Sequence, residues 1–302
     1  MRAWTAAPRP DVAVRQSGQD GRCRLQGKTN CGRVCCWVVE PPDGYYAGRG
    51  WGHTYSGKNL LGVWQPDNLV ATIRLQRVER PIPLMVKRVE WRNWENGLRG
   101  QQGTNAVMRF DMVMGDWLPP YGHGEIADLT IASKVTVTGT GRLRKTYPGF
   151  GWTSMDFYEV RNDVALSGMD AISEVPVDSR SGIKVRKVVS EPQGSVVSRT
   201  FKTRQVFERN GKDWYAERVT DHDPDRCYTF RIRTRRDGDG NLVEAYYGKI
   251  YGDFSFSGDL ERGVTEIRFL YYLNPVSLDR NLEWDMRNNL CPEPGSLGER
   301  RP

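Results

Sequence analysis

The sequence predicts an all-β protein, built as a large antiparallel β-sandwich or jelly roll in one unit or in two fused sandwiches. From about residue 68 onward, apolar residues alternate with polar ones in short runs, as in 105–114, where Ala106, Met108 and Phe110 share one parity. Side chains of a strand point to opposite faces at successive residues, so this pattern buries one face and exposes the other. Gly, Pro, Asn and Asp fill the gaps between runs, and no strand alternates with a long amphipathic helix. A parallel α/β sheet is therefore not expected.

The strand pattern defines the expected organisation of the chain. Residues 1–40 hold few strand signals and many Gly, Arg and Pro, so they predict an extended N-terminal extension. Residues 41–290 form the expected β domain, with a possible internal boundary near 168–182, and 291–302 form a tail. The expected strands are 60–64, 68–78, 84–91, 105–114, 125–138, 153–160, 183–189, 195–208, 213–220, 227–235, 242–251 and 263–273. Short helices are expected only near 91–99 and 278–288.

Two hairpins stand out. The first spans 227–251, where the turn 237–241 reads Asp-Gly-Asp-Gly-Asn between two alternating runs. Gly accepts the positive φ of tight turns, and Asp and Asn cap them with their side chains. The second joins 195–208 to 213–220 through Asn210 and Gly211, a favoured pair for a two-residue turn.

The amino-acid composition indicates which classes of partner the protein is expected to bind. The 302 residues include 44 basic and 37 acidic side chains, a net charge of +7. That excess favours a polyanion such as an acidic glycan, whereas nucleic acid is not favoured because the charge is diluted and no binding signature occurs. No run approaches the roughly 18 apolar residues that cross a bilayer. No secretory signal is visible, yet an exported or surface-associated protein is the favoured reading, and an oligomer is compatible with the sequence.

The cysteines divide into a cluster and a distant pair. The cluster comprises Cys23, Cys31, Cys35 and Cys36. Its intervening gaps are seven, three and zero residues, unlike the repeated C-x-x-C pairs of zinc ribbons. Buried thiols or a disulfide to the extension are the alternatives. In an oxidising compartment, Cys227 and Cys291 could form a disulfide that fixes the C-terminus.

Three short motifs resemble cofactor or metal sites, but the residues in and around each motif do not match what such a site requires. Residues 52–59 approach a P-loop but end in Asn59 rather than Ser or Thr. The 237–241 turn resembles a calcium loop, but Leu242 takes the position of the sharp-turn glycine. In 221–225, His222 lies among three aspartates and could act as a base or help to ligate a cation, but a solvated acidic loop is the favoured explanation of the segment. We therefore assign no cofactor and no metal.

The strongest functional signal is a basic and aromatic surface in the second half. Lys184 and Arg186 fall on one expected strand, and if the three basic strands are neighbours, seven cations share one sheet face. The proposed ligand-binding residues are Arg231, Arg233, Arg235, Lys202, Arg204, Tyr247, Trp91 and Trp94. Arg pairs with carboxylate, sulfate or phosphate, and aromatic rings stack on sugars. Trp117 and Trp152 lie in similar Gly- and Pro-rich surroundings. A solubilising face with ordinary core tryptophans is the alternative.

The expected function is a noncatalytic binding or structural module with a glycan or acidic polysaccharide as ligand. The rival is a β-sandwich hydrolase or lyase that uses two carboxylates, or a Tyr, His and Arg set, in a concave sheet. No catalytic residue is assigned. The carboxylates on expected strands that would be considered first are Asp111, Glu125, Asp128, Asp156, Glu159 and Glu217.

Overall fold

The computed structural model describes residues 2–5, 13–14, 35–39, 43–46, 48–51, 57–58, 64–65, 77–93, 105–144, 152–175, 185–207, 214–223, 226–259 and 264–292. The chain divides into two compact units. One comprises Met1–Arg80 with Ser179–Ile183, and the other comprises Pro81–Asp178 with Lys184–Pro302. The expected limits at residues 40 and 290 stay predictions.

The first unit contains a four-stranded antiparallel sheet in the order β2-β1-β3-β4. Its strands are β1 (Arg2–Thr5), β2 (Ala13–Val14), β3 (Cys35–Val39) and β4 (Gly48–Trp51), and a separate pair joins β5 (Gly57–Lys58) to β6 (Trp64–Gln65). The segment expected to be an extension therefore contributes three strands to a sheet. The expected strand 68–78 lies outside the described residues except at its end.

The second unit contains a six-stranded antiparallel sheet in the order β14-β13-β11-β10-β8-β9. Its strands are β8 (Asn105–Asp111), β9 (Asp116–Trp117), β10 (Leu129–Arg144), β11 (Trp152–Leu166), β13 (Val196–Phe207) and β14 (Trp214–Thr220). The hairpin predicted between 195–208 and 213–220 is confirmed as the antiparallel pair β13–β14. Its turn lies outside the described residues.

A seven-stranded sheet of the same unit runs β12-β15-β16-β18-β7-β19, with β17 paired to β18. Its strands are β7 (Ile82–Asn93), β12 (Ala171–Val175), β15 (Cys227–Arg236), β16 (Leu242–Tyr251), β17 (Ser255–Asp259), β18 (Val264–Leu273) and β19 (Trp284–Asn289). All its pairs are antiparallel except β19 with β7. The predicted 227–251 hairpin is confirmed, and Asp237 caps its turn by accepting the backbone N–H groups of Asp239 and Asn241 at 3.0 and 2.8 Å.

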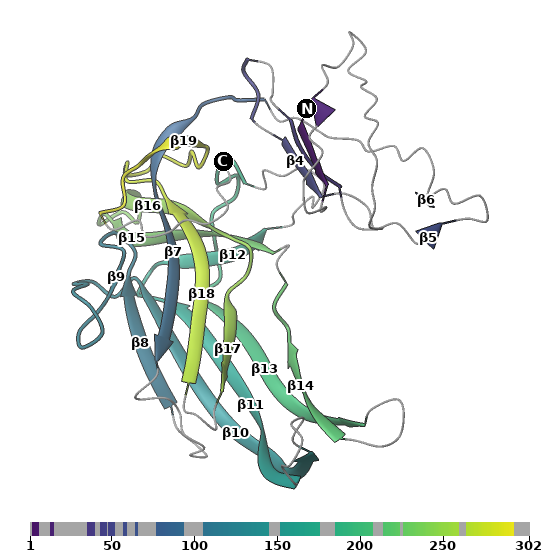
Figure 1. Ribbon diagram of the computed structural model, residues 1–302. Helices are drawn as coiled ribbons and strands as arrows, with labels where there is room; N and C mark the ends of the chain where they lie inside the picture. The colour runs from purple at the N-terminus through teal and green to yellow at the C-terminus, as the bar shows by residue number, and fades with distance from the viewer. Residues whose placement is uncertain are drawn as a thin grey trace. The chain divides into compact units, whose positions relative to one another are not determined.

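One hydrophobic cluster draws residues from both sheets of the second unit. Phe110, Ile131 and Val164 come from the six-stranded sheet, and Phe230 and Phe269 come from the seven-stranded one. In Figure 1, strands β7, β18 and β17 lie in front of β8, β10, β11 and β13. Among the described side chains of the six-stranded sheet, the apolar residues Met108, Phe110, Ile131 and Val164 belong to this cluster at alternate positions of their strands, whereas the polar residues Asn162 and Arg199 are also buried.

A second cluster covers the opposite face of the seven-stranded sheet. It joins Cys227, Tyr247 and Tyr272 from the strands to Val188 and Leu282 from segments without strand structure. Residues 227–232 of β15 are consequently all buried. The sheet is thus covered on both faces, and none of these six positions is a solvated one.

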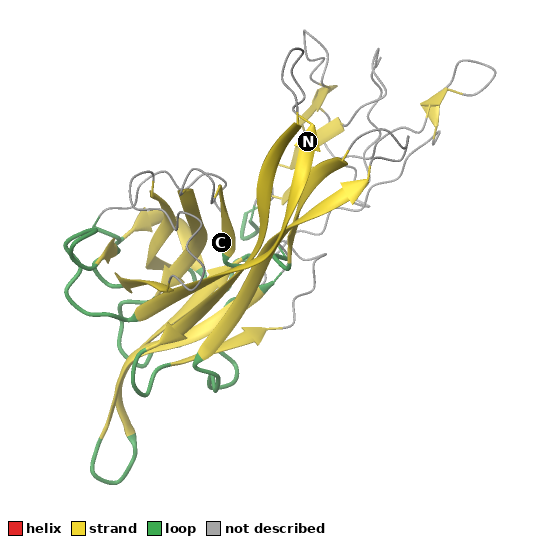
Figure 2. Cartoon of the chain, turned by 90° about the horizontal axis from the view of Figure 1, so that it is seen from below, coloured by secondary structure: helices red, strands yellow, loops and turns green. Residues whose placement is uncertain are grey.

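Some expectations were wrong. No helix occurs among the described residues (Figure 2), and within 278–288 the chain forms a turn followed by β19. The described part of 183–189 is a loop with one bridge at Lys187. Strand β12 instead lies inside the expected boundary 168–182. Cys227 and Cys291 are both buried and form no disulfide.

Candidate functional site

The predicted basic residues do not share a sheet face. Lys202 and Arg204 lie on β13 of the six-stranded sheet, and their side chains fall outside the described residues. Arg231, Arg233 and Arg235 lie on β15 of the seven-stranded sheet. Strands β13 and β15 belong to different sheets, so the seven basic residues do not lie on one sheet face. Lys184 is not described, and Arg186 lies in a loop rather than on a strand.

The three arginines of β15 are each paired with carboxylates. Arg231 donates from Nη1 to Glu191 Oε2 at 2.7 Å. Arg233 donates from Nη2 to Asp111 Oδ1 at 2.7 Å and from Nε to Asp128 Oδ1 at 3.1 Å. Arg235 pairs with Glu244 at 3.0 Å and has a 70% exposed side chain. Of the three, Arg235 alone is exposed as a solvated strand face requires.

The predicted aromatic residues also differ in setting. Tyr247 is buried, with 1% of its surface exposed. Trp91 lies on β7 but its side chain is not described, and Trp94 lies outside the described residues. The assignment of these positions to ligand binding stays a prediction.

Two of the carboxylates nominated for catalysis meet at Arg233. Asp111 and Asp128 are each 1% exposed, and Asp111 also accepts the backbone N–H groups of Met114 and Ile126 at 2.8 and 3.0 Å. Burial raises the pKa of Asp128 above its ordinary value, although Arg233 opposes the shift. Both carboxylates thus accept hydrogen bonds from donors inside the protein. Their effect is to hold the turn after β8 and the loop that leads to β10.

The turn after β8, together with β9, forms one wall of a pocket. The pocket has a volume of about 270 Å³ and lies between residues 87–90 of β7 and a wall of Phe110, Gly115, Asp116 and Trp117. Trp117 packs edge-on against Phe110, with ring centroids 5.0 Å apart. The pocket therefore combines charged side chains with two aromatic residues that are largely buried, since Phe110 is 1% and Trp117 is 7% exposed.

The opposite wall is the outer edge of β7. Four consecutive residues, 87–90, line this wall. Successive side chains of a strand point to opposite faces of the sheet, so four consecutive residues can line one pocket only at the edge of the sheet. Nearer the start of the strand, this edge is covered: the Asn289 side chain accepts from Val86 N at 2.9 Å and donates to Val86 O at 2.7 Å. Among the described residues, nothing pairs with the outward backbone groups of Arg88 and Glu90. These groups are available to a ligand.

The charged side chains that line the pocket differ in whether they have an ion-pair or hydrogen-bond partner. Arg88 and Glu90 pair at 3.9 Å. Asp116 accepts the backbone N–H groups of Trp117 and His123 at 2.8 and 2.7 Å. Lys87 has no carboxylate within ion-pair distance in the described part of the chain. Its ammonium group is therefore an unpaired donor at the pocket, and Arg88 Nε, which is buried, also has no hydrogen-bond partner among the residues that the structure describes.

Gly115 makes room for Lys87. It has a φ of +71°, and a Cβ there would lie 3.1 Å from Lys87 Cδ and 3.0 Å from Cys291 Sγ. A larger residue would strain the turn and push the lysine away. The turn itself is closed by Gly115 N donating to Asp111 O at 2.8 Å. Sequence reasoning missed Lys87 and Asp116; the signal was the Gly- and Pro-rich stretch 115–124 around Trp117.

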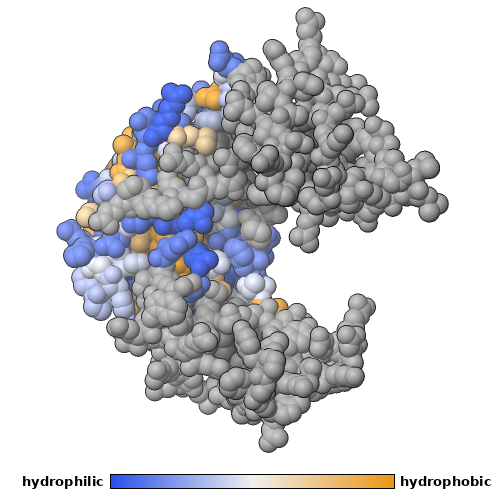
Figure 3. Space-filling view, viewed as in Figure 1, coloured by the Kyte–Doolittle hydropathy of each residue, from blue (hydrophilic) through white to orange (hydrophobic). Residues whose placement is uncertain are grey.

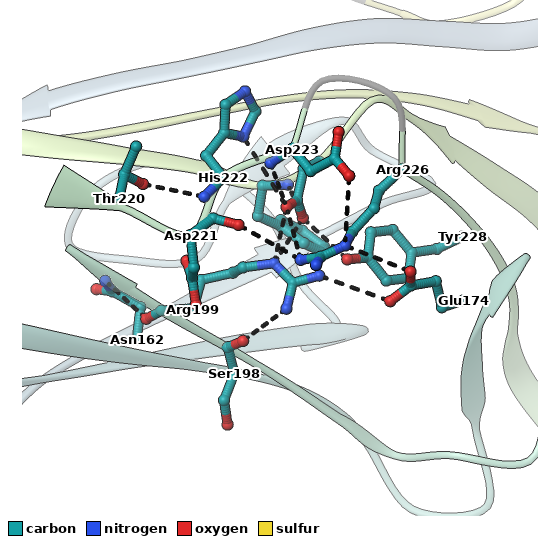
Figure 4. A network of polar contacts seen from close by, with 12 residues as sticks. Asn162, Glu174, Ser198, Arg199, Thr220, Asp221, His222, Asp223, Arg226 and Tyr228 are labelled. Atoms are coloured by element: carbon teal, nitrogen blue, oxygen red, sulfur yellow. Dashed lines mark hydrogen bonds and ion pairs between the residues drawn. The ribbon is translucent and has the colours of Figure 1, made fainter. Parts of the chain in front are cut away.

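A second polar network surrounds Asp253, which follows β16; Figure 4 shows its members Arg199, Arg226 and Tyr228. Its carboxylate is 0% exposed and accepts Arg199 Nε at 2.8 Å to each oxygen and Tyr228 OH at 2.9 Å. Arg226 Nη1 lies 3.5 Å away and His222 Nδ1 lies 4.0 Å away. His222, singled out in the sequence, is therefore brought close to a carboxylate outside its own loop. At 4.0 Å the two do not form a hydrogen bond.

Glu174 lies at the outer side of this network. Its Oε1 is 3.3 Å from Arg226 Nε, and its side chain is 55% exposed. Arg199 Nη2 and His222 Nδ1 are buried without a hydrogen-bond partner. Because those atoms are not reachable by solvent, we interpret the network as a structural hub joining β13, β15, residues 221–223 and Arg226 rather than as a binding site.

Lys249 of β16 is a fully buried titratable group with a strongly lowered pKa. It is 0% exposed, and its Nζ donates to Val185 O at 2.7 Å and lies 4.8 Å from the Tyr272 ring centre. Burial lowers the pKa of Lys249 to about 7, with Cys227 and Glu283 opposing the shift. No solvent reaches the amine, so it does not form an accessible site.

Neither a metal cluster nor a bilayer-spanning helix is found where the chain is described. No group of three His, Cys, Asp or Glu side chains in that part could hold a metal ion. Helices long and apolar enough to cross a membrane are likewise absent from those residues. No protein-family model matches the chain, and no curated protein or solved structure is significantly similar to it.

Proposed function

We propose that the second unit is a noncatalytic β-sandwich that binds glycan, with one sugar residue held in the pocket between β7 and β9. The observation that carries the proposal is the lining of that pocket: an aromatic wall at Trp117, acceptors at Glu90 and Asp116, and the unpaired donor Lys87. Sugars offer both apolar ring faces and hydroxyl groups that donate and accept, so they match a mixed lining of this kind.

The size of the pocket agrees with a single sugar residue. Its volume of about 270 Å³ lies just below the roughly 300 to 1,000 Å³ of sites for drug-sized ligands. The outward backbone groups of Arg88 and Glu90 supply further donors and acceptors along the β7 edge. A sandwich arrangement is supported by the core that both sheets share.

The hydrolase and lyase alternatives receive less support. Asp111 and Asp128 meet, but both are buried and bonded to Arg233 and to backbone donors. Tyr228 and Arg199 are bonded to Asp253, so they are not available as an acid and a charge neutraliser. A purely structural subunit would offer a large apolar surface. On the face in Figure 3, the described surface is mostly hydrophilic, with apolar residues in small areas.

The test is binding of the full chain to an array of neutral and acidic oligosaccharides, followed by titration calorimetry with the tightest of them. Lys87→Met keeps the length of the side chain and removes its donor. We expect it to weaken binding by about tenfold or more, the effect of losing a hydrogen bond from a charged group.

Arg235→Met is the matched control, because Arg235 is exposed, lies outside the pocket and was favoured by the sequence. It should bind as the wild type does. A wild-type chain that binds no glycan on the array would refute the function. Equal binding by the wild type and Lys87→Met would remove the pocket as the site.

A further inference from the structure

We propose that Arg231, Tyr247 and Arg280 form a carboxylate-binding site that the chain's own Glu191 occupies, and that a uronic acid residue can take the place of Glu191. Three donors from three elements converge on this one side chain. Arg231 Nη1 reaches Oε2 at 2.7 Å, Tyr247 OH reaches Oε1 at 2.8 Å, and Arg280 Nη2 also donates to Oε1.

The donors are held in place by groups other than Glu191. Arg231 donates from Nε to Thr234 Oγ1 and from Nη2 to Met169 O, both at 3.0 Å. The Arg280 guanidinium lies over the Tyr247 ring, 5.3 Å from its centre. Arg231 is 6% exposed and Tyr247 is 1% exposed, so packing also fixes them. A site whose donors are fixed independently of its occupant is preorganised for another carboxylate.

Glu191 reaches this site from a short segment anchored on both sides. Upstream, Val188 N donates to Arg280 O at 2.9 Å. Downstream, Gln193 N donates to Ser173 Oγ at 2.9 Å. Only the residues between these two points need to move for Glu191 to leave. Its side chain is 35% exposed and that of Arg280 is 42% exposed, so the outer side of the site is open to solvent.

The electrostatics of the site favour an anion. Burial opposes ionisation, yet the bonds from Tyr247 and Arg231 and the charges of both arginines lower the pKa of Glu191. With Glu191 removed, two cations and a phenol would face one another without an anion. Arg binds a planar carboxylate well because its N–H groups are arranged as a fork.

The uronate is the occupant we favour because the proposed glycan pocket belongs to the same unit. The carboxylate chemistry itself does not depend on that pocket, since the two sites share no residue. An acidic peptide is an outcome of the test rather than part of the proposal.

The experiment compares the wild type, Glu191→Ala and Glu191→Gln by thermal unfolding in the presence of acetate, glucuronate, methyl glucoside or a poly-glutamate peptide. We expect acetate and glucuronate to raise the Tm of Glu191→Ala saturably, and methyl glucoside to leave it unchanged. Calorimetry should give a Kd for glucuronate about tenfold or more below that of the wild type, because a tethered carboxylate competes at high effective concentration.

Glu191→Gln is the second variant, for the case in which Glu191→Ala does not fold. It keeps the acceptor for Tyr247 and lacks the charge. It should also bind glucuronate more tightly than the wild type. Glu244→Ala, which removes the partner of the surface residue Arg235 and the acceptor of Tyr246 OH, is the control and should show no carboxylate effect. Equal responses to glucuronate and methyl glucoside, or none in either Glu191 variant, would overturn the proposal. Stabilisation by poly-glutamate alone would replace the uronate with an acidic peptide. Failure here leaves the Lys87 experiment unaffected.

Discussion

Arg199 Nε lies 2.8 Å from both carboxylate oxygens of Asp253, although 54 residues separate them along the chain. The contact joins β13 of one sheet to the turn between β16 and β17 of the other. Asp253 also accepts the backbone N–H groups of Asp223 and Phe254 at 3.1 and 2.8 Å. Buried charges persist only when they are paired and hydrogen-bonded, and here both conditions are met.

Asp253→Asn should therefore destabilise the fold strongly. The substitution keeps the shape of the side chain but leaves Arg199 buried without its counter-charge, which costs about 3–5 kcal/mol of unfolding free energy. Urea unfolding followed by circular dichroism measures it. Glu174→Gln, at the exposed outer side of the same network, should cost under about 1 kcal/mol. Similar losses for both variants would show that Asp253 is not the hub.

Lys249 makes stability depend on pH. Its pKa is about 7 in the folded chain and 10.5 in the unfolded one, because burial disfavours the charged form. Between these values the unfolded chain binds more protons, so stability should rise with pH from about 7 to about 10.5. Lys249→Met should remove this rise and stabilise the fold at pH 6, by on the order of a few kcal/mol.

The measurement is the unfolding free energy of the wild type and Lys249→Met at pH 6, 8 and 9.5. The difference between the two chains isolates Lys249 from the other groups that titrate in this range. A difference that stays constant with pH, or a less stable variant at pH 6, contradicts a buried amine held at a lowered pKa.

How far the sequence predicted the fold is clearest at β15. The alternation of Tyr228, Phe230 and Ile232 identified the strand and its turn, because period two is a local property. It placed Arg231 on a solvated face, which was wrong. That face is covered by residues that include Val185, Val188 and Leu282, which lie in segments that form no strand. Burial of the second face is a long-range property, so alternation alone does not reveal it.

Arg233 shows the same limit for a site. It has a φ of +53°, unusual for a residue with a side chain, and the pairing of β15 with β16 shifts register between Ile232 and Arg235. It therefore bonds Asp128, 105 residues away in sequence, across the two sheets. The sequence nominated Asp128 as a possible catalytic group, but it held no sign of the bulge that brings an arginine to it.

The proposed glycan pocket depends on features that are more distant still. Trp117 was noted in the sequence as an aromatic residue among Gly and Pro turns, and it does line the pocket. Lys87 was not noted, because its role follows from the point at which β19 stops covering the edge of β7. Strand order and register set that point, and both arise from long-range pairing.

The most direct test of glycan binding by this pocket is an amide NMR titration of the ¹⁵N-labelled chain with the tightest oligosaccharide from the array. We predict saturable shifts centred on residues 87–90 and 115–117, and their loss in Lys87→Met. Shifts centred on Arg235 and the 237–241 turn, or an unchanged spectrum at saturating sugar, would contradict it.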